Sequence, residues 1–311
     1  MKILVCDRLE EKVLDKFEEL GEITNISESK TKTEDLKSNI VDTEIVVIRS
    51  GTKINKDILE NAKNLKIIAR CGVGVDNVDV EEATNKKIYV TNSPNANIIS
   101  VAELTIGLII SAARKIHVSN NSLKDKKWDR NKFLGTELYQ KQLGLVGFGK
   151  AANEVAKRLS AFGMNIVFYD PYVDSSTIEA KKVELDELLK TSDVISIHVV
   201  KTEETTNLIN NEKLNLIKKG GILVNTSRGG IIDEESLFQK ANEDLIFAGL
   251  DVFSQEPPDI NETFSKSNIV TTPHLGASTY EAQLKAGLET VQNVSDLSLI
   301  HISEPTRPNN I

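Results

Sequence analysis

Short runs of valine, isoleucine and leucine alternate with longer amphipathic stretches along most of the chain. Such runs are typical of parallel strands that are buried on both faces, and the amphipathic stretches are typical of the helices that cover them. The pattern therefore predicts an α/β protein built from βαβ units. Its strands fall into two separate blocks, which predicts two sheets.

The first block predicts four strands, at 3–5, 45–48, 66–69 and 88–90, and two helices, at 9–20 and 80–86. The second block predicts six strands, at 143–146, 166–169, 194–197, 222–224, 247–250 and 269–270. Between the blocks, charged residues interrupt the apolar stretch 98–117, which we interpret as a buried helix rather than a membrane span. The polar segment 118–142 that follows predicts an arm with a role in function or in oligomerisation.

Length and composition agree with a two-domain protein that binds small molecules. The 311 residues exceed the usual size of one hydrophobic core. The net charge of −8 gives no reason to expect nucleic acid or an anionic membrane as a partner. Cys6 and Cys71 show no CxxC spacing and no nearby histidine ligand, so we expect no metal site and a cytoplasmic location. The first apolar run is too short for a signal peptide.

A glycine-rich turn follows the first strand of the second block. The residues 147–152 read GFGKAA and precede a helical pattern at 153–162. Gly147 would permit the tight turn, Gly149 would let the backbone approach a pyrophosphate, and Ala152 would let helix and strand pack closely. Asp170 closes the next strand, where a carboxylate would bind ribose hydroxyls and repel a 2′-phosphate, so NAD is favoured over NADP.

Other residues at the ends of these strands are expected to complete the cofactor site: Lys150, Ala151, His198, Thr226, Ser227, Asp251 and Gly276. Structural alternatives remain open at this point. The glycines could merely shape a turn, Asp170 could cap a loop, and His198 could orient one.

Three segments place a charged or ionisable residue just past an apolar strand, where ligands bind in open α/β sheets. These residues are Arg228, Glu256 and His274. An arginine can hold the carboxylate of a 2-keto acid, and a histidine can exchange the proton during hydride transfer. Glu256 is expected to orient His274. Taken singly, Arg228 could be a surface cation, Glu256 a solvated acid and His274 a turn histidine.

With these segments, the sequence resembles the D-isomer-specific 2-hydroxyacid dehydrogenase family, and most closely its short phosphoglycerate-specific members. The resemblance extends from residue 1 to about 296. It also rests on Arg49-Ser50-Gly51-Thr52-Lys53, Arg70-Cys71-Gly72-Val73-Gly74-Val75-Asp76-Asn77, Ser100-Val101-Ala102-Glu103 and Gly135-Thr136-Glu137-Leu138.

The resemblance implies two Rossmann-like or flavodoxin-like domains, with an NAD-binding domain at 98–275 inserted into a substrate domain formed by 1–97 and 276–296. It also implies a homodimer through the helix and arm at 98–142, with tetramers left open. The substrate-binding residues that it implies are Arg49, Arg70, Gly72, Val73, Gly74, Asn97, Ser100 and Arg130. Three arginines in this set favour a phosphorylated substrate, because arginine suits phosphate.

Departures from the family pattern occur at Lys150-Ala151-Ala152 and at Val200, which affect the shape of loops and remove no catalytic group. From Leu297 the sequence leaves the pattern, so we expect 297–311 to be a non-native tail. His301 is therefore given no role.

The leading hypothesis is NAD-dependent oxidation of D-3-phosphoglycerate to 3-phosphohydroxypyruvate, which begins serine synthesis. A glyoxylate/hydroxypyruvate reductase, or another D-2-hydroxyacid dehydrogenase, is the alternative within the same chemistry. An NAD-sensing interaction module, like the corepressors that share this fold, is the alternative from another class.

Overall fold

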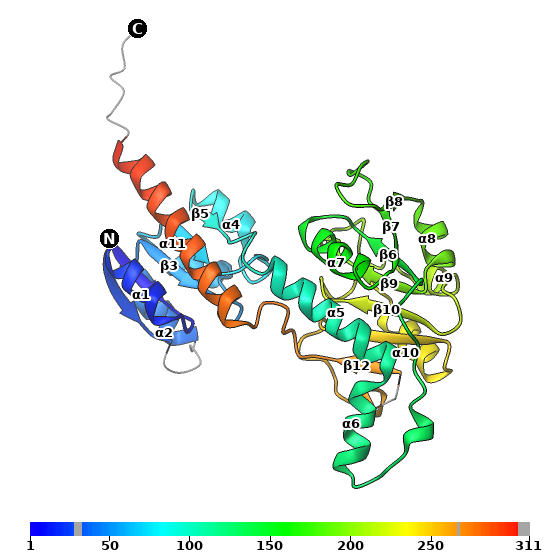
Figure 1. Cartoon of the computed structure of the whole chain (residues 1–311). Coiled ribbons are helices and arrows are strands. Elements are labelled where there is room, and N and C mark those ends of the chain that lie inside the picture. Colours follow the sequence, from blue (N-terminus) through cyan, green and yellow to red (C-terminus); the bar gives the residue numbers. More distant parts are fainter. Residues whose placement is uncertain (28–32, 266–267, 304–311) are drawn as a thin grey trace. The chain divides into compact units, whose positions relative to one another are not determined.

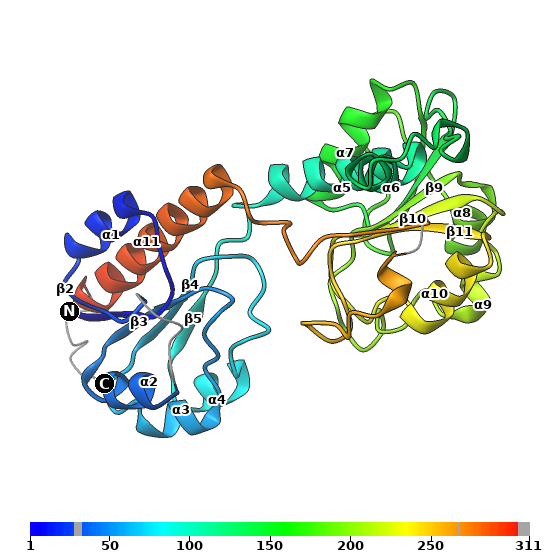
Figure 2. The same ribbon diagram turned by 90° about the horizontal axis from the view of Figure 1, so that it is seen from below.

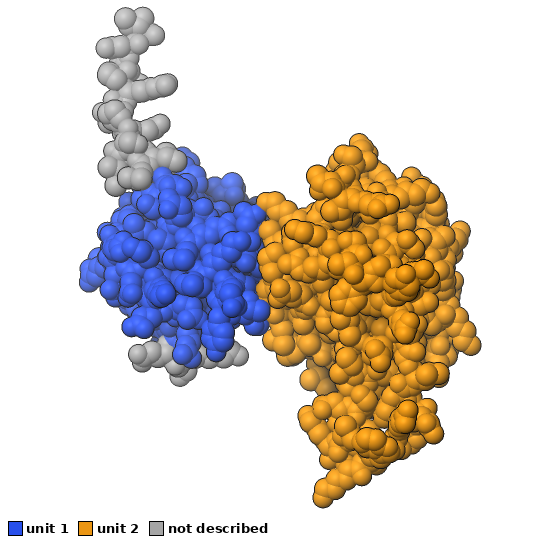
Figure 3. Space-filling model, in the orientation of Figure 1, with its two compact units in different colours: residues 1–97, 277–311 blue, residues 98–276 orange. Residues whose placement is uncertain are grey.

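The computed structural model describes residues 1–27, 33–265 and 268–303, and the chain divides into two compact units (Figures 1 and 3). Unit 1 comprises Met1–Asn97 and Ala277–Ile311, and unit 2 comprises Ile98–Gly276. Of the expected non-native tail, residues 297–303 continue the last helix, whereas 304–311 lie outside the described residues.

Unit 1 contains a parallel sheet of five strands in the order β2-β1-β3-β4-β5, which is the flavodoxin-like order. Its strands are β1 (Lys2–Val5), β2 (Glu22–Asn25), β3 (Ile45–Ile48), β4 (Ile67–Arg70) and β5 (Tyr89–Thr91). Every residue of β3 is buried, as expected for a strand that helices cover on both faces.

Helices cover both faces of this sheet (Figure 2). On one face, α1 (Glu11–Glu18) and α11 (Tyr280–Ser303) share a core in which Phe17 and Val294 are fully buried. On the other face lie α2 (Thr33–Asn39), η1 (Ile40–Asp42), α3 (Lys56–Asn61) and α4 (Val80–Asn85). The segment after Gly276 therefore completes the core of unit 1.

Unit 2 contains a parallel sheet of seven strands in the order β12-β11-β10-β9-β6-β7-β8. Its strands are β6 (Gln142–Val146), β7 (Asn165–Tyr169), β8 (Lys181–Lys182), β9 (Val194–Ile197), β10 (Gly221–Asn225), β11 (Ile246–Leu250) and β12 (Ile269–Thr271). The order reverses between β6 and β9, as in dinucleotide-binding folds, and ligands bind at such a switch point.

The helices of unit 2 also lie on both faces of its sheet. One core contains residues of α5 (Ile98–Arg114) and α7 (Lys150–Ser160), and the other contains residues of α8 (Leu185–Thr191), α9 (Asn211–Leu214) and α10 (Glu234–Asn242). A further helix, α6 (Ile116–Lys124), and the short turn η2 (Arg130–Lys132) form the arm that extends from unit 2 (Figure 1). The turn η3 (Glu262–Ser265) precedes β12.

The α/β class and the two doubly wound parallel sheets confirm the predicted fold. The predicted helix 98–117 was wrong at its end, because Lys115 adopts a left-handed conformation with φ 51° and separates α5 from α6. The predicted helix 153–162 begins three residues earlier, at Lys150. Within the described part of the chain, we find no helix that combines the length and the apolar character needed to cross a membrane.

Candidate active site

The glycine-rich turn lies at the carboxyl end of β6, at the switch point of the unit 2 sheet. Gly147 has φ 87°, and a Cβ atom there would come within 2.8 Å of the carbonyl oxygen of His198. A side chain at Gly147 would therefore be both strained and obstructed. At Gly149, in contrast, φ is −76°, and apart from its chain neighbours no atom of the described residues lies within 4 Å of an added Cβ. Packing within the protein therefore does not explain this second glycine.

Hydrogen bonds from neighbouring elements hold this turn. The Phe148 amide donates to Asp170 Oδ2 over 2.8 Å, and Asn153 Nδ2 donates to the carbonyl oxygens of Phe148 and Gly149. Asp170 Oδ1 accepts from the Tyr172 amide as well. Asp170 thus orders the loops on both sides of it, in addition to the ribose contact that the sequence predicts.

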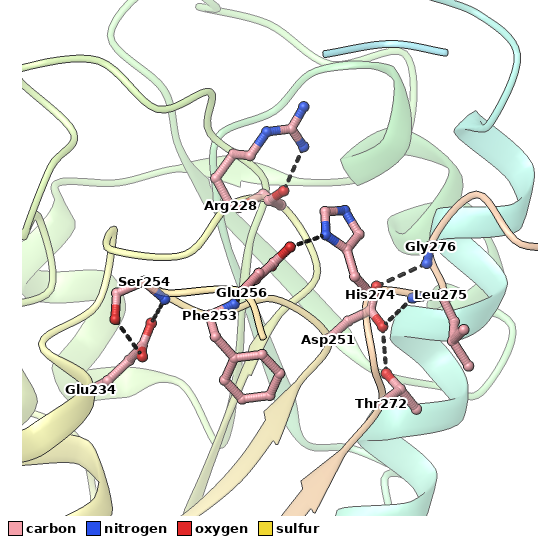
Figure 4. Close-up of polar contacts among 11 residues, drawn as sticks. Arg228, Glu234, Asp251, Phe253, Ser254, Glu256, Thr272, His274, Leu275 and Gly276 are labelled. Carbon is pink, nitrogen blue, oxygen red and sulfur yellow. Dashed lines mark hydrogen bonds and ion pairs between the residues drawn. The ribbon is translucent and has the colours of Figure 1, made fainter. Parts of the chain in front are cut away.

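Glu256 and His274 come together from the loops that follow β11 and β12 (Figure 4). The distance between His274 Nδ1 and Glu256 Oε2 is 2.6 Å, and Glu256 Oε1 accepts from the Phe253 amide over 3.1 Å. The His274 side chain is 48% exposed, so its ring remains accessible to a substrate. The pairing fixes Nδ1 toward the carboxylate and leaves Nε2 as the nitrogen available for chemistry.

Asp251 organises the turn that carries His274 (Figure 4). Its carboxylate is buried and accepts hydrogen bonds from Thr272 Oγ1 and from the amides of Leu275 and Gly276, at 2.5–2.8 Å. Burial raises the pKa of Asp251, although these donors act in the opposite direction. His274 adopts φ 55° within this turn, and its amide donates to the Asp251 carbonyl oxygen. The predicted contact of Asp251 with the cofactor stays a prediction.

The loop after β10 carries Arg228 and is shaped by Asn225. Asn225 Oδ1 accepts from the amide and hydroxyl of Ser227, and its Nδ2 donates to the Arg228 carbonyl oxygen. Thr226 is buried, and its hydroxyl lies 2.7 Å from that of Thr105 in α5. The side chains of Thr226 and Ser227, expected to bind the cofactor, therefore also fix this loop.

The Arg228 loop and the Glu256 loop are tied to each other by Glu234 at the start of α10. Glu234 Oε1 accepts from the Ser254 amide over 2.6 Å and from the Gly230 amide over 3.4 Å. At Gly229, an added Cβ would lie 1.8 Å from the Phe253 carbonyl oxygen, so only glycine allows the two loops to approach this closely. These contacts fix where Arg228 lies relative to the Glu256–His274 pair.

His198 follows β9, next to the glycine-rich turn, as the sequence predicts. Its Nε2 lies 2.9 Å from the Ser196 hydroxyl, and its amide donates to the Val146 carbonyl oxygen. Burial lowers the pKa of His198 to about 4. The ring is therefore neutral near pH 7 and presents no positive charge beside the turn.

Unit 1 brings two of the predicted substrate residues to the carboxyl ends of adjacent strands. Arg49 follows β3 and Arg70 ends β4. Gly72 has φ 155°, and an added Cβ there would lie 1.9 Å from Arg70 Nη1, so the glycine makes room for this guanidinium. The Asp7 carboxylate accepts from the Arg49 amide over 2.6 Å. Cys71, which stands between Arg70 and Gly72 in the sequence, is buried, and burial raises its pKa to about 11.

The remaining predicted residues are distributed over both units. Val73 and Gly74 continue the loop after β4, and Asn97 is the last residue of unit 1 before α5. Ser100 lies in the first turn of α5, and among the described residues no hydrogen-bond partner is found for its buried hydroxyl. Arg130 lies in η2 of the arm and is exposed. Lys150 and Ala151 begin α7.

Sequence reasoning did not assign roles to Asn225, Glu234, Thr105 or Thr272. Asn225 carried a recognisable signal, since asparagine before a turn commonly accepts hydrogen bonds from the backbone that follows. Glu234 and Thr105 carried none, because their partners lie far away in the sequence.

Comparison with known proteins identifies the family of this chain. Residues 106–276 match the family described as D-isomer specific 2-hydroxyacid dehydrogenase, NAD binding domain. The D-3-phosphoglycerate dehydrogenase of Methanocaldococcus jannaschii is 47% identical over 94% of this chain and 57% of its own length. The hydroxypyruvate reductase of Thermotoga maritima is 45% identical over 94% of this chain and 97% of its own length. The chain belongs to the D-isomer-specific 2-hydroxyacid dehydrogenase family.

Solved structures of family members are similar throughout the chain. The NAD⁺-bound 3-phosphoglycerate dehydrogenase of Entamoeba histolytica is 30% identical, with a TM-score of 0.81, and covers 100% of this chain and 99% of its own. In contrast, the chain spans only 57% of the length of the Methanocaldococcus relative.

Unit 2 contains the NAD-binding domain of the dehydrogenase family, and its residues fit this cofactor. The open space beside Gly149 lies at the start of α7, where a pyrophosphate would approach the backbone and the positive end of the helix dipole. Asp170 stands at the end of β7, where it suits the ribose of NAD rather than a 2′-phosphate.

Proposed function

We propose that this chain oxidises D-3-phosphoglycerate to 3-phosphohydroxypyruvate with NAD, the first step of serine biosynthesis. The observation that carries the proposal is the 2.6 Å contact between Glu256 and the exposed His274 on an NAD-binding unit. The names of the relatives support phosphoglycerate as the substrate.

His274 acts as the base in this direction of the reaction. Nδ1 donates its proton to Glu256, so Nε2 carries the lone pair that accepts the proton of the C2 hydroxyl group. The glycine-rich turn and Asp170 would hold NAD, which would supply the hydride acceptor for C2, so that the alcohol becomes a ketone. Glu256 stabilises the positive charge that the proton brings to the imidazole. In the reverse direction, His274 returns the proton.

Arg228 holds the carboxylate of the substrate. A guanidinium offers two parallel donors that match a carboxylate, which would orient C2 toward His274. The Asn225 and Glu234 contacts support this role, because they fix the loop from which Arg228 extends.

The phosphate group is bound by arginines. Arg49 and Arg70 from adjacent strand ends, together with Arg130, supply positive charge. The Gly72 amide donates to the Arg70 carbonyl oxygen, and the amides of Val73 and Gly74 in the same loop are offered to the carboxylate. Asn97 and Ser100 add polar contacts to the substrate. Arginine is the residue best suited to bidentate phosphate recognition.

Reduction of hydroxypyruvate is the second candidate function. It is favoured by the Thermotoga maritima relative, which bears that name and which this chain matches over nearly its whole length. Both functions use the same chemistry at C2, so only the phosphate distinguishes them.

The experiment that separates them compares kcat/KM for 3-phosphohydroxypyruvate and for hydroxypyruvate, with NADH absorbance as the readout. We expect wild type to prefer the phosphorylated substrate by at least about 100-fold, since a lost charged contact costs several kcal/mol. Arg49→Ala should remove most of this preference and leave hydroxypyruvate turnover nearly unchanged. Equal values in wild type, or no effect of Arg49→Ala, would refute the phosphate assignment.

We also propose a cytoplasmic homodimer that forms through α5, α6 and the arm. Trp128 and Leu134 in the arm are 82% and 86% exposed in the single chain, which supports their burial against a second copy. Sedimentation equilibrium should give about twice the chain mass of 34.4 kDa; a mass equal to one chain would contradict the dimer.

A further inference from the structure

Unit 2 contains a pocket at the end of its sheet that lies opposite the Glu256–His274 pair. The pocket measures about 360 Å³, which is within the range of small-molecule sites. It lies where β6, β9, β10 and β11 begin, whereas the glycine-rich turn and His274 follow the ends of strands. In a parallel sheet the starts and the ends of the strands lie at opposite ends of the sheet. The pocket therefore cannot belong to the active site.

Positive charge dominates the lining of this pocket. Four lysines and a single aspartate contribute to it: Lys115, Lys141, Lys218, Lys219 and Asp193. The charged residues of the lining therefore sum to a net charge of +3. This local excess stands out in a chain whose net charge is −8.

The aspartate is already committed to partners in the protein. Asp193 Oδ2 accepts from the Gln142 amide over 2.9 Å, and Oδ1 lies 3.1 Å from Lys218 Nζ. Burial alone would raise the pKa of Asp193, but these two contacts and the nearby Lys141 hold it below its usual value. Asp193 is thus ionised, but its single negative charge cannot balance the four lysines that line the pocket.

Lys115 and Lys141 are the most informative of these lysines, because both are half-buried. Over the described ranges, neither ammonium has a carboxylate within ion-pair distance. Lys115 Nζ instead lies 5.7 Å from the ring centroid of Phe247, a contact that does not cancel its charge. Charged groups that are partly removed from water usually have a partner of opposite charge. Among the described residues, neither lysine has a carboxylate within ion-pair distance to serve as that partner.

The end of α5 opposes this positive charge only in part. A helix C-terminus carries about half a negative charge, and Ala112 and Ala113 at the end of α5 line the pocket. The Ala113 carbonyl oxygen is already used, since it accepts from the Thr136 amide over 2.9 Å. The net field in the pocket remains that of the lysines.

From these observations we propose that the pocket binds a small phosphate-bearing metabolite, with its phosphate between Lys115 and Lys141. Lysine suits phosphate as a compact point charge. Phe247, which also lines the pocket, offers apolar surface to the remainder of the bound metabolite. The proposal does not depend on the catalytic function, because it uses none of the active-site residues.

The test measures binding of inorganic phosphate to the full chain by calorimetry, at constant ionic strength and with saturating NADH. The double variant K115Q/K141Q should weaken one class of phosphate site at least tenfold. The control K190Q removes one lysine charge from the exposed end of α8, which matches the single variant K141Q, and should leave the affinity unchanged. The variant R49Q/R70Q should retain binding in this pocket and lose binding at the substrate arginines, which separates the two proposals.

Three outcomes would overturn the assignment. Phosphate binding could be unchanged in K115Q/K141Q, it could fall equally in K190Q, or it could appear only on dilution that separates subunits, which would mean that a second copy covers the pocket. Should the double variant fail to fold, as judged by its circular dichroism, K141Q alone gives the same comparison with an expected loss of at least threefold.

Discussion

His274 combines an exposed ring with a constrained backbone, and Asp251 connects the two. A non-glycine residue with φ 55° costs of order 1 kcal/mol, and it persists only when its surroundings hold it. Asp251 provides this by accepting from Thr272, Leu275 and Gly276 around the turn. Buried contacts therefore set the direction of the imidazole, and its exposed position leaves Nε2 accessible for proton transfer.

His274→Ala tests the proton-transfer role. We expect kcat to fall roughly 10²–10⁴-fold, because general acid–base catalysis contributes about this much. The dissociation constant of NADH, measured by fluorescence, should stay within about twofold, since the glycine-rich turn is untouched.

Glu256→Gln is the companion of this variant, because it keeps the shape of the side chain and removes its charge. We expect a smaller loss of kcat than in His274→Ala, since a neutral amide can still accept from Nδ1 but stabilises the imidazolium less. If His274→Ala retained wild-type kcat, the assignment of the base would be wrong.

His198 makes the stability of unit 2 depend on pH. Its folded-state pKa of about 4 lies below the value of 6.5 expected in the unfolded chain. Between these values the unfolded state binds a proton that the folded state does not, so stability is lost as pH falls from 6.5 toward 4. The loss is at most about 3 to 4 kcal/mol, and smaller because His198 as a residue is only half-buried.

Urea unfolding at several pH values measures this effect. The variant His198→Asn should show a shallower decrease in the free energy of unfolding between pH 6.5 and 4 than wild type. Carboxylates titrate in both proteins, so only the difference between the two slopes is attributed to His198. Identical slopes would show that the ring is not held neutral by its surroundings.

At the scale of elements, strands with an apolar run were predictable, including the edge strands β5 and β12, and two edge strands without such a run were not. The strands in the interior of both sheets were found from their apolar runs. In contrast, β2 is mostly exposed and β8 consists of two lysines, and each lies at the edge of its sheet. Only one neighbour and little apolar burial define such a strand, so its sequence carries no apolar run.

The site was predictable to the same extent and for the same reason. Arg228, Glu256 and His274 follow buried strands, whose positions the sequence indicates. Their supporting contacts could not be predicted, because the bond between Thr105 and Thr226 joins residues that only the folded chain brings together. The left-handed break at Lys115 likewise has no signal in a stretch otherwise suited to one helix.

The turn between β6 and α7 allows the two glycines to be distinguished experimentally. Gly147→Ala should lower the free energy of unfolding by about 1–3 kcal/mol, since alanine is strained at φ 87° and approaches His198. Gly149→Ala, which meets no atom of the described residues apart from its chain neighbours, should leave stability unchanged and weaken NADH binding. Chemical denaturation and NADH titration of both variants give the comparison; a stable Gly147→Ala would contradict the strain argument.

At the scale of the whole molecule, one unit is continuous in sequence and the other is not. All residues of the two unit 2 cores lie between Ala102 and Val270. We therefore expect the segment Ile98–Gly276, expressed alone, to unfold cooperatively and to bind NADH with an affinity close to that of the full chain. Calorimetry and fluorescence titration check both points. A segment without a cooperative transition would show that unit 2 requires unit 1.

The position of α11 has a consequence for synthesis on the ribosome. Val294 of α11 shares the core on one face of the unit 1 sheet with Val13 and Phe17 of α1, yet α11 is translated after the whole of unit 2. At ribosomal speeds this interval lasts roughly 10–40 s. During this interval α1 alone covers that face of the N-terminal strands, and the part that α11 covers in the folded protein stays exposed while unit 2 is synthesised. Nascent chains of this protein should therefore be substrates for ribosome-associated chaperones until α11 emerges.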